Sequence, residues 1–280
     1  MKKLLPLILL FSFSYSYATH WMSSIEEAQK LALGTNKLIL VDFWASWCGP
    51  CKKMDRESWT DEEVKQLLDN FILVRINVSQ DRRTPLKFGI SSIPDVFILN
   101  GNGDEVFRYK NYMTKDQVME MLQKYALNTS FMQNESINYY KHESYNTAFL
   151  LGKKYLDYSL YLEDEVRGNF LDLGEKYLKK SQKLLDSDQS NYAVVNQKIE
   201  LLELASDLYE KNFDKVGRSL EKDFMETNIL EPNRSLFYFI NYCYSKSEES
   251  ESAQEWLAKL KKLDNHEVFL QKSELLYAVN

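Results

Sequence analysis

The pattern of apolar residues changes near Asn128 and divides the chain into two kinds of structure. Between residues 19 and 127, segments with helical spacing alternate with short, dense runs of branched and aromatic apolar residues. Such runs are typical of strands buried on both faces, so their alternation with helices predicts an α/β domain with a mixed central sheet. From residue 128 to 280 only helical periodicity remains, which predicts an all-α domain.

The strands of the first region can be placed individually. Residues 37–43 and 71–78 are predicted as buried strands that pair in parallel. Residues 95–99 and 105–109 are predicted as a hairpin around the Asn-Gly-Asn-Gly turn at 100–103. Helices on both faces are needed to cover such a sheet, and the intervening segments supply them.

Hydroxyl side chains mark three expected helix starts. Ser24 and Thr114 each precede a helical pattern, and Thr60 with Glu63 matches a capping box. We expect the first of these helices to stop at Gly34.

In the second region, apolar stripes with steps of three and four predict helices around residues 192–209 and 253–263. Polar stretches at 185–190 and 246–252 are expected to be turns between antiparallel helices. The pattern indicates a bundle or a short array similar to tetratricopeptide repeats, although no fixed period is clear.

The first 18 residues have the pattern of a secretory signal. A basic start precedes an apolar run at residues 4–11, and Ser16 and Ala18 stand three and one before the expected cut after Ala18. An N-terminal membrane anchor is the alternative, but the run is shorter than the ~20 residues needed to span a bilayer. We therefore expect export to the periplasm or the exterior, with no stable membrane insertion after cleavage.

The net charge of −6 gives little reason to expect nucleic acid as a partner, because an acidic chain repels phosphate backbones.

The Trp-Cys-Gly-Pro-Cys-Lys segment at residues 47–52 carries the clearest chemistry. Two thiols three residues apart at a helix start can close and reopen a disulfide ring. The helix N-terminus favours a thiolate at Cys48, which would act as the nucleophile, and Cys51, one turn inward, would resolve the mixed disulfide. This redox-active pair implies no further cofactor.

A zinc site and a structural disulfide are the two alternatives to a redox-active cysteine pair. Half of a zinc site would need a second ligand pair, and only Cys243 and three scattered histidines are present. A purely structural disulfide would constrain little chain entropy across two intervening residues. Cys243 lies among aromatic residues on an expected helix, so we predict a buried, inert thiol rather than a regulatory one.

The segment Val-Asp-Phe-Trp-Ala-Ser-Trp-Cys-Gly-Pro-Cys-Lys at residues 41–52 resembles the active-site segment of the thioredoxin family. The resemblance covers roughly residues 20–127. Trp21 ahead of a Ser-Ile-Glu-Glu-Ala helix resembles secreted bacterial thioredoxin-like thiol-disulfide oxidoreductases. It implies a thioredoxin-like fold, with residues 1–18 as signal peptide, 19–127 as the thioredoxin-like domain and 128–280 as a helical extension.

The resemblance also implies roles for residues around the dithiol. Asp42 matches the buried acid that helps deprotonate the resolving cysteine; the alternative is a surface carboxylate at a strand end. Pro94 matches a cis proline facing the dithiol, whose preceding residue Ile93 pairs with an extended substrate chain; the alternative is an ordinary trans proline. Trp47 is expected to belong to the docking surface.

Gly49 and Pro50, between the two cysteines, are expected to contact substrate as well.

Three departures from the family pattern are visible. Arg75 stands where a lysine near the buried acid is common, and it is expected to modulate Asp42. Asn111 and Tyr112 replace a glycine after the last strand, which predicts an altered substrate groove. Little chain precedes the first helix, so the family's first strand is expected to be short or missing.

Gly-Pro between the cysteines resembles the reducing members of the family, so we expect an exported enzyme that reduces disulfides of a client protein. In an oxidising compartment it would need a membrane-embedded electron donor. The alternative is a helical binding or chaperone-like module that holds a client while the dithiol adjusts its disulfides.

Overall fold

The computed structural model describes residues 20–278. The predicted signal peptide, residues 1–18, and its cleavage after Ala18 lie outside the described residues. Among residues 20–278, every helix is too short or too polar to span a lipid bilayer.

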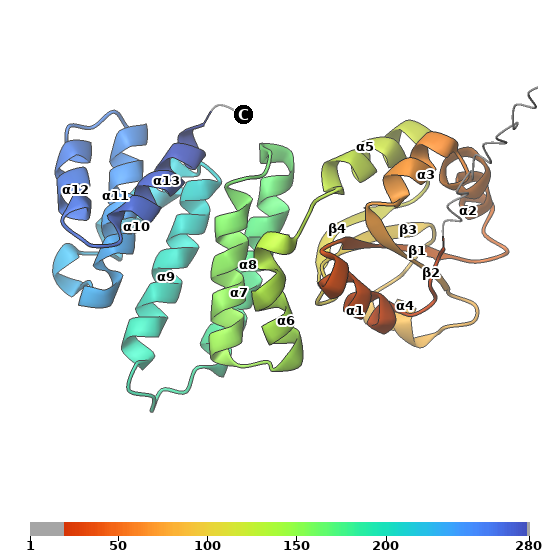
Figure 1. Cartoon of the computed structure of the whole chain (residues 1–280), viewed down its shortest axis with the longest axis horizontal. Helices are drawn as coiled ribbons and strands as arrows, with labels where there is room; N and C mark the ends of the chain where they lie inside the picture. The colour runs from red at the N-terminus through yellow and green to blue at the C-terminus, as the bar shows by residue number, and fades with distance from the viewer. Residues whose placement is uncertain (1–19, 279–280) are drawn as a thin grey trace, which may run out of the picture.

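The first region is built on a four-stranded sheet with strand order β2-β1-β3-β4 (Figure 1). Its strands are β1 (Leu38–Trp44), β2 (Phe71–Asn77), β3 (Asp95–Leu99) and β4 (Glu105–Lys110). Strands β1 and β2 are parallel, whereas β3 is antiparallel to both β1 and β4. The predicted parallel pair and the hairpin are therefore confirmed.

Helices precede, separate and follow these strands. They are α1 (Ile25–Thr35), α2 (Gly49–Met54), the π-helical turn Asp55–Trp59, α3 (Glu62–Leu68), α4 (Arg83–Lys87) and α5 (Lys115–Tyr125). Where the family's first strand is expected, a single parallel bridge joins Met22 to Val74.

Two of the predicted caps are confirmed and two helix boundaries are corrected. The Ser24 and Thr114 side chains accept the backbone N–H three residues on, as N-caps do. Helix α1 does not stop at Gly34; it ends at Thr35, and the capping residue Asn36 has a left-handed φ of 58°. Asp61, not Thr60, caps α3, because its carboxylate accepts two backbone N–H groups while the Thr60 hydroxyl donates backwards.

The sheet is covered on both faces, which is why nearly every residue of β1 is buried. Ile39, Val41 and Phe43 face a cluster that α1 completes. Leu38 and Leu40 face the opposite way, toward α3 and α5. Figure 1 shows α3 and α5 above the sheet and α1 and α4 below it.

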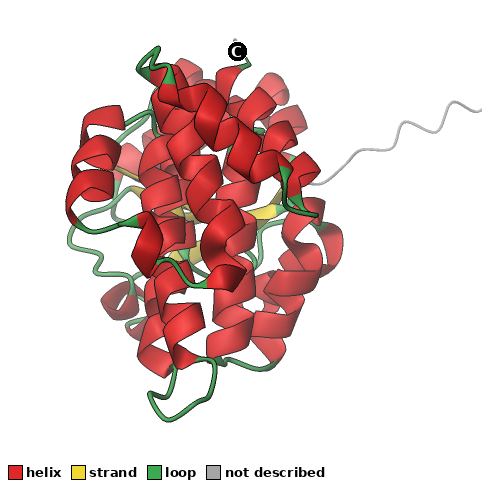
Figure 2. Ribbon diagram, turned by 90° about the vertical axis from the view of Figure 1, so that its left-hand side faces the viewer, coloured by secondary structure: helices red, strands yellow, loops and turns green. Residues whose placement is uncertain are grey.

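The second region is helical throughout. Its elements are the 3-10 turn Ser130–Met132, α6 (Gln133–Lys141), α7 (Tyr145–Ser159), α8 (Asp164–Leu184), α9 (Tyr192–Tyr209), α10 (Phe213–Lys222), the 3-10 turns Glu226–Asn228 and Glu231–Asn233, α11 (Arg234–Ser247), α12 (Ser252–Lys261) and α13 (His266–Tyr277). When the molecule is viewed from the side on which these helices lie, they nearly hide the strands (Figure 2). Turns separate α8 from α9 and α11 from α12 as expected; the tetratricopeptide-like repeat stays a prediction.

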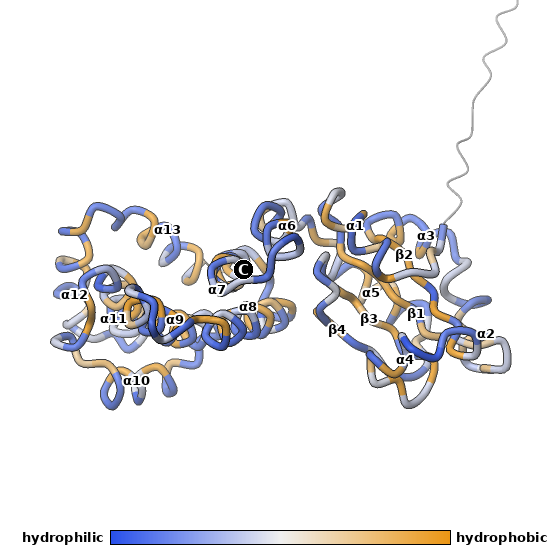
Figure 3. Tube along the Cα trace, turned by 90° about the horizontal axis from the view of Figure 1, so that it is seen from below, coloured by the Kyte–Doolittle hydropathy of each residue, from blue (hydrophilic) through white to orange (hydrophobic). Residues whose placement is uncertain are grey.

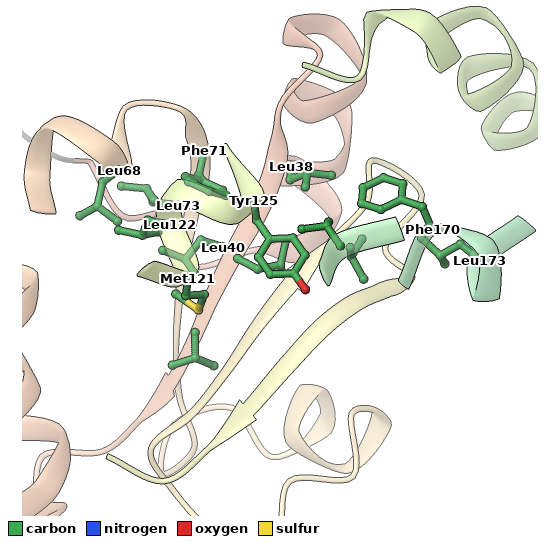
Figure 4. Close-up of a cluster of buried hydrophobic side chains, with 14 of the residues drawn as sticks. Leu38, Leu40, Leu68, Phe71, Leu73, Met121, Leu122, Tyr125, Phe170 and Leu173 are labelled. Carbon is green, nitrogen blue, oxygen red and sulfur yellow. The ribbon is translucent and has the colours of Figure 1, made fainter. Parts of the chain in front are cut away.

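Helices α7 and α8 share a core with the sheet. One continuous cluster of buried side chains joins Leu38, Leu40 and Tyr125 to Phe170 and Leu173 of α8. Figure 4 shows Phe170 and Leu173 beside Leu38 and Tyr125. The first two long helices of the second region therefore complete the hydrophobic core of the first.

A buried polar network fixes the same junction. The amide nitrogen of Asn100, at the end of β3, donates to the hydroxyls of Tyr155 at 2.9 Å and Tyr177 at 3.0 Å. Tyr177 in turn donates to Asp104. Because an unpaired buried polar group is costly, this network specifies how the hairpin sits against α7 and α8.

Close contact between α7 and α8 requires glycine at their crossing. A Cβ built on Gly152 would lie 2.8 Å from the carbonyl oxygen of Gly174. Gly168, also in α8, has no neighbour closer than 3.7 Å to such a Cβ.

We therefore predict opposite effects of two Gly→Ala substitutions. Gly152→Ala lowers the free energy of unfolding by about 1–3 kcal/mol, because the two helices are forced apart. Gly168→Ala raises it by about 0.5–1 kcal/mol, because alanine is the better helix former. Urea unfolding of both variants measures the difference; equal stabilisation by the two would contradict this description of the crossing.

Candidate active site

Cys48 and Cys51 lie at the start of α2, just beyond the end of the central strand β1. They form a disulfide with an S–S distance of 2.07 Å. Cys48 is the N-cap of α2, and its Sγ accepts the backbone N–H of Cys51 at 3.1 Å. The helix start thus presents a backbone donor to the sulfur predicted to become the thiolate.

The two sulfurs are nearly covered, and the residues around them are exposed. Cys48 is 3% exposed and Cys51 2% exposed. Trp47 is 68% exposed, and its indole N–H donates to the Ser79 hydroxyl at 2.9 Å. Gly49 and Pro50 are also exposed, so the surface next to the cysteines is open to solvent.

The Ile93–Pro94 segment closes the other side of the dithiol. Its peptide bond is cis, as predicted. The Sγ of Cys48 lies 3.8 Å from the carbonyl oxygen of Ile93, and the Ile93 side chain packs against the small cluster of Ala45, Cys48 and Cys51. Pro94 itself is buried.

The residues that replace the family's glycine stand next to this segment. The Asn111 N–H donates to the carbonyl oxygen of Pro94 at 2.9 Å, and Asn111 has a left-handed φ of 86°. The Tyr112 hydroxyl donates to Glu57 at 2.8 Å, and Lys53 lies 4.5 Å from the centre of its ring. Tyr112 is thus held by side chains that follow the dithiol in the chain.

Asp42 is buried in β1, 2% exposed, and pairs with Arg75 across the parallel β1–β2 ladder. An Nη2 atom of Arg75 lies 3.0 Å from Asp42 and 2.8 Å from Asp55. One guanidinium therefore compensates two carboxylates, as the sequence led us to expect for Asp42 alone.

Aromatic rings hold Arg75 in place. Its guanidinium carbon lies 4.6 Å from the centre of the Trp44 ring and 5.4 Å from that of Trp21. Trp59 meets Trp21 edge-on, with ring centres 5.7 Å apart. Cation–π contacts stabilise a partly desolvated guanidinium, and they explain why Arg75 stays beside Asp42.

Burial raises the pKa of Asp42 from 3.8 to about 6, although the positive charge of Arg75 opposes the shift and the charge of Asp55 adds to it. The carboxyl group can therefore exchange a proton near neutral pH, which is the property a proton acceptor needs.

Cys243 is far from this site. It is buried in α11 as predicted, and burial raises the pKa of its thiol to about 12. Helices α11 and α2 lie toward opposite ends of the molecule (Figures 1 and 3).

Sequence reasoning missed Asp55, Trp21 and Ser79 as neighbours of the site. Asp55 follows Cys51 by four residues, so helical spacing could have placed it on the same face as that cysteine. The contacts of Trp21 and Ser79 join segments distant in sequence, and no local pattern indicates them.

The first region of the chain is similar to known thioredoxin-like proteins. A family model described as a thioredoxin-like domain matches residues 25–126. Thioredoxin of Rickettsia prowazekii is 33% identical over 31% of this chain and 79% of its own length. Thioredoxin-T of Drosophila melanogaster is 32% identical over 35% of this chain, which spans 60% of that relative.

A third relative is much longer. Thiol:disulfide interchange protein DsbD of Campylobacter jejuni is 28% identical over 39% of this chain but only 19% of its own length. The three similarities cover between 31% and 39% of this chain.

A cysteine pair at a helix start, set beside a cis proline on a thioredoxin-like sheet, defines a thiol-disulfide oxidoreductase. The chain belongs to the thioredoxin family. The helical residues beyond 126 lie outside the matched family model.

The raised pKa of Asp42 predicts a pH-dependent stability cost. Between pH about 4 and about 6 the folded protein keeps a proton that the unfolded chain releases, so this group's contribution to stability falls as pH rises and levels off above pH 6. Asp42→Asn cannot titrate. Its stability relative to the parent should therefore improve by about 2 kcal/mol between pH about 4.5 and about 8.

Urea unfolding of both proteins at the two pH values measures this change. Using the difference between variant and parent cancels the titration of other groups. A difference that does not vary with pH would show that Asp42 ionises in the folded protein as it does in the unfolded chain.

Proposed function

We propose that the chain is an exported reductase that cleaves disulfide bonds of client proteins through Cys48 and Cys51. The observation that carries this proposal is the Cys48–Cys51 pair at the start of α2, with the buried Asp42–Arg75 pair on the adjoining strands. The thioredoxin relatives and a relative named as a thiol:disulfide interchange protein support the same chemistry.

The first step forms a mixed disulfide. The Cys48 thiolate attacks one sulfur of the client disulfide, so a Cys48–client S–S bond forms while the client's own S–S bond breaks. The other client sulfur leaves as a thiolate and takes a proton. The backbone N–H of Cys51, which reaches the Cys48 Sγ, favours the attacking anion.

The second step releases the client. Asp42 accepts the proton of the Cys51 thiol, and the resulting thiolate attacks the Cys48 sulfur. The Cys48–Cys51 bond forms and the second client thiolate leaves, so the client gains two electrons and the enzyme becomes oxidised. The disulfide in the structure corresponds to this product state.

The exposed surface around the cysteines receives the client. Trp47, Gly49 and Pro50 form one side of this docking surface. The backbone of Ile93, ahead of the buried Pro94, forms the other and pairs with an extended client segment by strand addition.

The cellular setting follows from the leader and from the redox balance. Residues 1–18 direct export, cleavage follows Ala18, and the enzyme works in the periplasm or outside the cell. The thioredoxin-like domain spans 19–127 and the helical domain 128–280. Each turnover consumes two electrons, so a membrane-embedded donor must reduce the Cys48–Cys51 disulfide again; no other cofactor is required.

Substitution of single cysteines tests these roles. Cys51→Ser should accumulate a covalent enzyme–client disulfide, because nothing resolves it, whereas Cys48→Ser should form none and lose turnover. Cys243→Ser is the matched control and should keep full turnover. Alkylation and mass spectrometry after mixing each reduced variant with a disulfide peptide identify the adducts; an adduct on Cys51 in Cys48→Ser, formed at the parent rate, would reverse the assignment.

A further inference from the structure

Five exposed basic residues surround the dithiol, and we call them the basic rim. They are Lys52, Lys53, Arg82, Arg83 and Lys110. Lys52 and Lys53 follow Cys51 directly in α2.

Contacts bring the other members to the same end of the sheet. Arg82 and Arg83 begin α4, shortly after Ser79, whose hydroxyl accepts the Trp47 N–H. Both ends of the segment that carries α4, Val78 and Ile93, pack against the cluster that contains the two cysteines.

Lys110 ends β4, paired in register with Asp95, and the next residue, Asn111, donates to the Pro94 carbonyl. Each basic residue therefore lies on a segment that is adjacent to the dithiol in the chain or is connected to it by a hydrogen bond or a packing contact.

Three acidic residues on these segments form salt bridges within the protein. Asp55 pairs with Arg75, Glu57 with Lys53 and Asp95 with Arg108. Asp81 accepts the backbone N–H groups of Arg83 and Thr84. The salt bridges offset the charges of Asp55, Glu57 and Asp95, whereas Asp81 keeps its negative charge next to Arg82 and Arg83 in the chain.

The rim's own charges are mostly not neutralised. Within residues 20–278, Lys52, Arg82, Arg83 and Lys110 have no carboxylate within the 4.0 Å of a salt bridge. These unpaired positive charges gather on one face of a chain whose net charge is −6. Such a patch attracts negative partners and repels positive ones.

Exposed apolar side chains accompany the charges. Trp47 is 68% exposed and Leu86, in α4, 82% exposed. An apolar contact ringed by charge is the usual composition of a protein-recognition surface.

We propose that the basic rim selects client disulfides flanked by acidic residues, so that Asp- and Glu-rich segments dock around Trp47 and Leu86. This inference rests on the proposed reductase function and names its substrate class. The rim positions the client segment, and the chemistry at Cys48 and Cys51 is unchanged.

Three peptides with the same disulfide loop test the inference, flanked by Glu-rich, Lys-rich or Gly-Ser segments. The reduced full chain is mixed with each, and the second-order rate constant of disulfide reduction is measured. We expect the Glu-rich peptide to react about tenfold faster than the Lys-rich one at low ionic strength. The preference should shrink at an ionic strength of about 0.5 M, where charges are screened beyond a few ångströms.

Two double variants that change the net charge equally distinguish the effect of the basic rim on the peptide preference from the effect of the protein's total charge. Arg82→Glu/Arg83→Glu should abolish or invert the preference. Lys261→Glu/Lys262→Glu reverses two exposed lysines at the end of α12, far from α2 (Figure 1), and should retain it.

The Gly-Ser peptide distinguishes this inference from the proposed function. If all three peptides are reduced at equal rates, or if both double variants lose the preference alike, the rim does not select clients and the reductase stands. If the reduced enzyme cleaves none of the peptides, the proposed function fails and this inference fails with it.

Discussion

The buried charge of Asp42 is the constraint around which the site is arranged. Strand β1 is covered on both faces, and a carboxylate in such a strand is costly unless a positive charge lies beside it. Arg75 supplies that charge from the neighbouring strand, and the rings of Trp21 and Trp44 hold its guanidinium. Arg75 offsets only part of the cost of burying the Asp42 carboxylate, because burial still raises the Asp42 pKa to about 6. The protein thus keeps in the strand that leads to the dithiol a carboxyl group that exchanges a proton near neutral pH, at some cost in stability.

The helical region contributes to this arrangement from a distance. Phe170 and Leu173 of α8 enter the cluster that contains Leu38 and Leu40 of β1, so part of the face that buries Asp42 is closed by helices beyond residue 130. The dithiol lies at the end of the sheet away from these helices (Figures 1 and 3). The helices therefore support the core without covering the surface around the dithiol.

Much of the fold and of the site could be predicted from local sequence. Dense apolar runs indicated the strands, hydroxyl caps placed α1 and α5, and an acid inside an apolar run indicated that Asp42 is buried. The wrong predictions concerned helix ends at which two nearby residues could each act as the capping residue. Thr60 and Asp61 are both capping residues, and only the folded chain shows that the carboxylate reaches two N–H groups.

Contacts between distant segments had no local signal. Asp55 shares Arg75 with Asp42 only because the helix after Cys51 packs over the sheet, and the tyrosines of α7 and α8 that bind Asn100 look like ordinary core residues in the sequence. Whether Cys48 and Cys51 form a reducing dithiol is decided by the reduction potential of the pair. Equilibration of the protein with glutathione buffers, followed by thiol alkylation and mass spectrometry, measures this potential. A reducing dithiol should have a potential near the roughly −270 mV of thioredoxin, whereas a potential near about −120 mV would show that the pair donates disulfides instead.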